Sequence, residues 1–99
     1  MKVKLYGIEY DLVNEFPKQT EAKDDDCWGY INQKHKVIFI NKKAPRIYTF
    51  GHEIAHAMLE IGGRKHDEGL CSTIGYLLET MLESNDINEI IKFLKDIEG

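Results

Sequence analysis

The chain has 99 residues, which fits one domain and not two. An apolar share of 42%, a charged share of 30% and a net charge of −4 argue against a disordered chain and against a basic nucleic-acid-binding domain. No apolar run approaches the ~20 residues of a membrane span, and no signal peptide is recognisable, so we expect no membrane or nucleic-acid partner. Cys27 and Cys71 are expected as reduced thiols in a cytoplasm, which is the host cytoplasm if a phage encodes the chain.

The first half of the sequence predicts strands. Residues 2–6 and 9–13 alternate apolar and polar side chains, which indicates a β-hairpin that turns near Gly7-Ile8. Residues 17–26 are polar and end in three aspartates, and an exposed loop is expected there because the spaced ligands of a calcium loop are absent. Residues 28–31 and 37–40 flank a polar turn at 32–35 and predict a second hairpin.

The second half predicts three helices. Pro45 suits the first position of a helix that ends at Gly62-Gly63. Asp67-Glu68 open a second helix that ends at residues 84–86, and its apolar positions at helical spacing are Leu70, Ile74, Leu77, Leu78 and Met81. A short third helix follows, and its apolar face, which either completes the core or contacts a partner, consists of Ile87, Ile90, Ile91 and Leu94.

These elements predict an α+β fold in one domain over residues 1–99. A small, mainly antiparallel sheet of about four N-terminal strands should pack on two to three helices. The first helix would carry the chemistry described next.

The five residues from His52 to His56 match the pattern H-E-x-x-H. The two histidines are four positions apart, so on a helix their imidazoles project from one face and can share one ion. Glu53 lies about 100° around the helix axis, where it cannot join them as a ligand but can reach a bound water molecule. The alternative interpretation is a pair of histidines that binds no ion.

A catalytic zinc site needs a third protein ligand and an open fourth position. Glu68 is the best candidate, because it begins the next helix and lies away from the apolar positions of that helix. Asp67 and His66 are its rivals, and the helix dipole alone would also explain an acid at this place. Glu60 is eight residues from His52, about 12 Å along the axis, which is too far for one ion.

Small residues surround this candidate ligand. Ser72 and Gly75 follow Glu68 on the same side of the helix and would let the two helices approach closely. Cys71 could reach the metal but is expected as a small buried residue. Cys27 precedes the motif as a cysteine ligand does in peptide deformylases, whose other signatures are missing, so that family stays a minor alternative.

The sequence resembles the compact gluzincin-type zinc peptidases (minigluzincins) and, more closely, the small prophage and phage-encoded relatives of the ImmA/IrrE metallopeptidases. The resemblance covers roughly residues 2–82 and is carried by VKLYGIEY at 3–10, WGYIN at 28–32, VIFIN at 37–41, HEIAH at 52–56 and HDEGL at 66–70. It implies a minimal zincin-like domain in which His52, His56 and Glu68 bind one zinc ion per chain and Glu53 is the catalytic base.

The expected function is zinc-dependent hydrolysis of peptide bonds, in which a zinc-activated water attacks a peptide or protein substrate and Glu53 acts as general base. His66, Tyr48 and Tyr76 are candidates for the further donor that stabilises the oxyanion. The main alternative is a non-enzymatic phage or prophage protein with a structural zinc site that binds a host or phage protein. A third possibility is hydrolysis of a non-peptide amide, and the sequence defines no oligomeric state.

Overall fold

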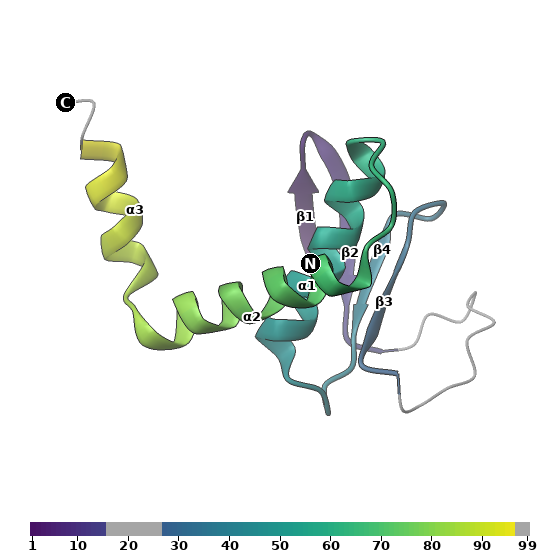
Figure 1. Cartoon of the computed structure of the whole chain (residues 1–99), viewed down its shortest axis with the longest axis horizontal. Coiled ribbons are helices and arrows are strands. Elements are labelled where there is room, and N and C mark those ends of the chain that lie inside the picture. The colour runs from purple at the N-terminus through teal and green to yellow at the C-terminus, as the bar shows by residue number, and fades with distance from the viewer. Residues whose placement is uncertain (16–26, 97–99) are drawn as a thin grey trace.

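The structure is a computed structural model that describes residues 1–15 and 27–96. The polar stretch at 17–26, with its three aspartates, was expected as an exposed loop and lies outside the described residues. Within these described ranges, four strands precede three helices (Figure 1). The elements are β1 (Lys2–Leu5), β2 (Ile8–Val13), β3 (Gly29–Asn32), β4 (Val37–Ile40), α1 (Arg46–Ile61), α2 (Glu68–Ser84) and α3 (Ile87–Asp96).

The strands form one mixed sheet in the order β1-β2-β4-β3. The pairs β1/β2 and β3/β4 are antiparallel hairpins, whereas β2 and β4 run parallel in the centre of the sheet. The expected α+β class is therefore confirmed. The first hairpin turns at Tyr6-Gly7 and not at Gly7-Ile8, because Tyr6 and Gly7 both have positive φ, 52° and 80°, as tight two-residue hairpin turns require. The second turn, at residues 33–36, lies one position later than expected.

One face of the sheet is covered by α1. Tyr10, Ile38 and Ile40 from the strands meet Ala57 of the helix in the buried core. The helix packs on the half of the sheet formed by β3 and β4. Gly29 of β3 makes this approach possible, since a Cβ there would lie 2.7 Å from the Thr49 side chain. This edge of the sheet therefore lies directly beside the helix that carries the H-E-x-x-H motif.

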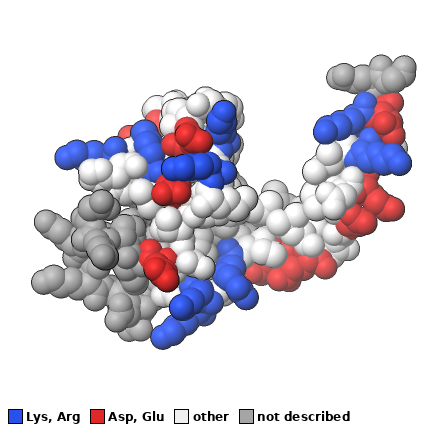
Figure 2. Space-filling model, turned by 180° about the vertical axis from the view of Figure 1, so that it is seen from behind, with Lys and Arg blue, Asp and Glu red and all other residues white. Residues whose placement is uncertain are grey.

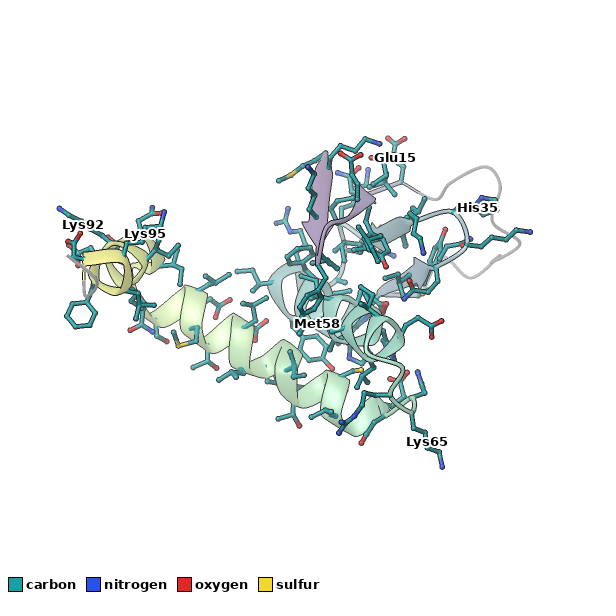
Figure 3. All side chains as sticks on the ribbon, turned by 90° about the horizontal axis from the view of Figure 1, so that it is seen from above. Glu15, His35, Met58, Lys65, Lys92 and Lys95 are labelled. Atoms are coloured by element: carbon teal, nitrogen blue, oxygen red, sulfur yellow. The ribbon has the colours of Figure 1, made fainter. Side chains whose placement is uncertain are left out.

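A second helix forms the outer layer, because α2 packs on α1 and not on the sheet (Figure 3). The helices cross at two glycines: a Cβ on Gly75 would lie 2.7 Å from the Tyr48 carbonyl oxygen, and one on Gly51 would lie 3.0 Å from the Gly75 Cα. The buried residues of α2 are Cys71 and Gly75. Leu77, which belongs to the apolar series expected to pack, is 62% exposed, because α2 uses its small residues for the contact.

The third helix takes no part in these layers. α2 extends past α1 and carries α3 away from the body of the molecule (Figure 1), and α3 contains no buried residue. The radius of gyration is accordingly 14.7 Å, against about 13 Å for a compact chain of this length. Two helices thus cover the sheet in successive layers, and the third does not contribute to the core. Within the described residues, no helix has both the length and the apolar character needed to cross a bilayer.

Candidate metal centre

Helix α1 places the two motif histidines on one face. The Nε2 atoms of His52 and His56 lie 3.1 Å apart, and only 16% and 11% of the two side chains are exposed. The rings make an edge contact with centroids 4.8 Å apart. The four-residue spacing produces this convergence, since residues one helical turn apart are neighbours on the same face.

Glu68 completes the set from the start of α2. Asp67 caps this helix, with its side chain accepting a hydrogen bond from the Leu70 backbone N–H at 2.9 Å, so Glu68 becomes the first helical residue. Its Oε2 lies 3.0 Å from His52 Nε2, and its Oε1 lies 3.0 Å from His56 Nε2. In a tetrahedral site with bonds of about 2.0–2.1 Å, ligand atoms are about 3.3 Å apart, so these separations suit one ion.

The structure thus brings together the three residues that the sequence favoured as ligands. Of the two rivals of Glu68, Asp67 serves as the helix cap. Glu60 belongs to neither metal-compatible group found among the described residues, in agreement with its exclusion on distance. One group contains His52, Glu53 and His56, and the other contains His56, His66 and Glu68.

His66, the other rival, lies at the rim of the site. Its Nε2 is 3.1 Å from Glu68 Oε1, and its ring stacks on His56 with centroids 4.6 Å apart and an interplanar angle of 13°. The side chain is 66% exposed. An imidazole in this place can orient the carboxylate, donate to a substrate oxygen, or add a fourth ligand.

Glu53 follows His52 on α1, and its side chain is buried, with 6% of the residue exposed. A carboxylate oxygen of Glu53 is within 4.8 Å of a ring nitrogen of each motif histidine. Burial, with a smaller contribution from the negative charge of Glu68, raises the pKa of Glu53 to about 7. A carboxylate with this pKa suits the exchange of protons with water near neutral pH.

The charges of the ligand set also suit a cation. Burial lowers the pKa of His56, which outweighs the opposing effect of Glu68, so the imidazole is neutral at pH 7. Partial burial would raise the pKa of Glu68, but the interactions with His56, His52 and His66 together lower it. A neutral imidazole at His56 beside an ionised carboxylate at Glu68 is the combination that a divalent ion needs.

Ser72 was expected only as a small residue, and the structure gives it a further contact. Its Oγ lies 3.4 Å from Nδ1 of His52, the ring nitrogen that faces away from the ligand set. A neutral His52 that offers Nε2 to a metal carries its proton on Nδ1 and can donate it to this hydroxyl. The signal in the sequence was a hydroxyl residue one turn after Glu68, which places both on the same face of α2.

A cavity of about 130 Å³ adjoins this site, between β3 and α1. It is lined by His52 and Glu53 on the polar side and by Trp28, Gly29, Tyr48 and Thr49 elsewhere. Tyr48 stands at the centre of an aromatic group, 5.8 Å from the Trp28 ring and 4.4 Å from the Tyr76 ring. Of the candidate oxyanion donors, Tyr48 is buried, whereas Tyr76 is 59% exposed.

The two cysteines stand apart from the metal-compatible groups of the described residues. Cys71 is fully buried, as expected for a small core residue, and burial raises the pKa of its thiol. The Cys27 thiol donates to the Gly29 carbonyl oxygen at 3.0 Å. Both are free thiols.

Comparison of the chain with protein-family models, with curated proteins and with solved structures gave no match. The class of the molecule therefore rests on its own geometry. It is an α+β domain with a candidate metal centre of two histidines and one glutamate, set beside a buried second glutamate.

Proposed function

We propose that this chain is a minimal zinc-dependent metallopeptidase of the gluzincin type, similar to the phage-encoded relatives of the ImmA/IrrE peptidases. One observation carries the proposal: donor atoms of His52, His56 and Glu68 converge within 3.0–3.1 Å beside the buried carboxylate of Glu53. A purely structural metal site has no need of a buried base.

The donor set fits zinc. Two imidazole nitrogens and one carboxylate oxygen form a borderline set that zinc accepts in tetrahedral geometry, and three protein ligands leave one position for water or substrate. Hard ions such as Mg²⁺ and Ca²⁺ favour sites made of oxygen atoms alone. His52, His56 and Glu68 would hold the ion, with Ser72 orienting His52 from behind.

Zinc in this position supplies Lewis-acid chemistry, polarising the scissile carbonyl and lowering the pKa of water. Glu53 takes the proton of the attacking water and passes it to the leaving amine. The burial that raises its pKa to about 7 also makes it a better proton acceptor than an exposed carboxylate. His66, exposed and 3.1 Å from Glu68, is the best placed of the three candidates to donate to the developing oxyanion.

A peptide substrate has a place to bind beside this centre. β3 is the edge strand of the sheet next to α1, and an extended peptide can add to such an edge. The cavity lined by Trp28, Tyr48 and Thr49 opens beside Glu53 and would receive one substrate side chain. The free thiols of Cys27 and Cys71 support action in a reducing cytoplasm, of the host if a phage encodes the chain.

The test is peptide-library hydrolysis by the wild type and by Glu53→Gln at equal zinc content. Loss of the base should lower the rate about 10²–10⁴-fold, while Glu60→Gln, an exposed control on the same helix, should keep the wild-type rate. Equal slow cleavage by the wild type and Glu53→Gln would point to a contaminating protease and contradict the proposal.

A binding protein with a structural zinc site is the second candidate, and His66 favours it. An imidazole 3.1 Å from Glu68 could add a fourth ligand and close the coordination sphere, as structural zinc sites do. The absorption spectrum of the cobalt(II)-loaded protein distinguishes the two functions, because it shows whether His66 is a ligand. A spectrum that changes with His66→Ala, together with no hydrolysis by the wild type, would favour the binding protein. A spectrum that is unchanged by His66→Ala supports the peptidase.

A further inference from the structure

Helix α3 presents an apolar face that is largely open to solvent in the described structure. Ile87, Ile90, Ile91 and Leu94 line one side, with Phe93 beside them. None is buried, and Ile91, Phe93 and Leu94 are 42%, 67% and 58% exposed. Large apolar residues gathered on one side of an exposed helix are typical of an interaction surface.

A second apolar surface of the same chain is an open groove of about 910 Å³ between the sheet and the helices. Its floor and walls come from Leu12 and Ile40 of the sheet, Ile47 and Phe50 of α1, and Leu82 of α2. It includes none of the residues of the metal centre. It lies where the end of β2, at Leu12 and Val13, faces the first turns of α1 at Ile47 and Phe50.

The link between α2 and α3 directs α3 away from this groove. Only Asn85 and Asp86 join the two helices, and both act as caps. The Asn85 amide donates to the Met81 carbonyl oxygen at 3.1 Å, and the Asp86 carboxylate accepts from the backbone N–H groups of Asn88 and Glu89 at 3.0 and 3.2 Å. These bonds close the end of α2 and the start of α3, so each helix is capped on its own side of the link.

We propose that α3 lies in this groove of a second copy of the chain, and that the exchange is reciprocal in a two-fold symmetric dimer. Each copy supplies one helix and one groove. The apolar residues of the helix then cover those of the groove, and both surfaces leave water together.

Charges of both signs on the two surfaces allow ion pairs between copies. The groove is bordered by Asp11, Glu15, Lys42 and Arg46, and α3 carries both signs in Glu89, Lys92, Lys95 and Asp96. We call α3 and the link before it, residues 85–96, the arm. Figure 2 shows acidic and basic side chains together on this arm. Lys92 and Lys95 lie at the opposite end of the molecule from Glu15 (Figure 3), so these charges can meet only between copies.

The surface area that the contact would bury also favours a reciprocal dimer, in which both α3 helices are bound, over a contact made by one α3 helix. An Ile, Leu or Phe side chain removes roughly 60–120 Å² of apolar surface from water. Five such residues on each arm, with the groove surface that they cover, give on the order of 1,200–2,400 Å² for the reciprocal dimer. Stable interfaces bury about 1,200–2,000 Å², and a single arm would supply half of the estimate.

The test is sedimentation velocity of the full chain over a hundredfold range of concentration. The wild type should form dimers, and Leu94→Glu should be monomeric. Leu77→Glu is the matched control, since Leu77 is equally exposed, at 62% against 58%, but lies on α2 outside the groove and outside α3. A wild type that is monomeric throughout, or a dimer that Leu94→Glu and Leu77→Glu leave equally intact, would overturn the proposal.

Mixing two variants identifies the surfaces that meet. Ile47→Glu damages the groove, Leu94→Glu damages the helix, and each variant alone should be monomeric while keeping the circular dichroism of a folded chain. Their mixture should form heterodimers that are weaker than the wild-type dimer but stronger than either homodimer, because one intact helix still meets one intact groove. Failure to recover them would overturn the exchange. The metal plays no part, so Glu68→Gln should dimerise like the wild type even if the proposed function is wrong.

Discussion

The two halves of α2 show opposite ways of using a helix. The first half crosses α1 through Cys71 and Gly75 and brings Glu68 over the motif histidines. The second half carries larger apolar residues, among them the 62% exposed Leu77, and leads to an α3 without any buried residue. Close contact through small residues thus builds the site, whereas the apolar face of α3 has no such close contact with the rest of the described chain.

Core and arm should respond very differently to the loss of one large side chain. Ile38, fully buried under α1, should lose about 2–5 kcal/mol of unfolding free energy when replaced by Ala. Leu94→Ala on the arm should change it by less than about 0.5 kcal/mol in dilute solution, where copies are separate. Urea unfolding measures both. A loss of 2 kcal/mol for Leu94→Ala in dilute solution would show that α3 packs on its own chain.

The buried base should make the metal-free protein less stable as the pH rises. The pKa of Glu53 is about 7 in the folded chain, against an ordinary 4.5, so the folded state holds a proton that the unfolded state releases between these values. Its contribution is full below about pH 4.5 and is lost as the pH rises through 7, on the order of 3 kcal/mol in total.

Glu53→Gln removes this contribution. With chelator present, the variant should match the wild type at pH 5 and exceed its stability at pH 8. The comparison isolates Glu53, because the lowered pKa values of His56 and Glu68 affect both proteins alike. Curves that stay parallel from pH 5 to pH 8 would show that Glu53 is not desolvated.

The helix crossing can be tested with two glycines of the same helix. Gly75→Ala places a Cβ 2.7 Å from the Tyr48 carbonyl oxygen and should cost about 1–3 kcal/mol and weaken zinc binding. Gly69→Ala meets nothing closer than 3.5 Å and should gain about 0.5–1 kcal/mol from helix propensity. Thermal unfolding of both variants measures these changes in stability. Equal changes for Gly75→Ala and Gly69→Ala would mean that α1 and α2 do not approach closely at Gly75.

The smallest expected effect concerns the residue behind His52. Ser72→Ala removes the hydroxyl 3.4 Å from Nδ1 and should weaken zinc binding about tenfold, with no change in the number of ions bound. Ser84→Ala, at the last residue of the same helix, is the control and should bind zinc like the wild type. An unchanged affinity for Ser72→Ala would make Ser72 a packing residue only.

Local patterns allowed much of this architecture to be predicted. The H-E-x-x-H spacing predicts α1 and two candidate ligands on it, and an acid at the start of the next helix makes Glu68 the third candidate, because both depend on contacts within or between adjacent helices. The parallel pairing of β2 with β4 could not be predicted, since it joins strands that are separated by more than twenty residues. The exposure of Leu77 was also missed, because helical periodicity does not say which face a neighbouring helix will contact.

If His52, His56 and Glu68 form one metal site, zinc affinity must depend on Glu68. Zinc titration of the wild type, Glu68→Gln and Glu60→Gln in competition with a chromophoric chelator measures this dependence. We expect one zinc ion per chain, a loss of affinity of more than about 100-fold for Glu68→Gln and wild-type binding for Glu60→Gln. A wild type that binds no zinc, or a Glu68→Gln variant that binds it as tightly as the wild type, would show that these residues do not form a metal site.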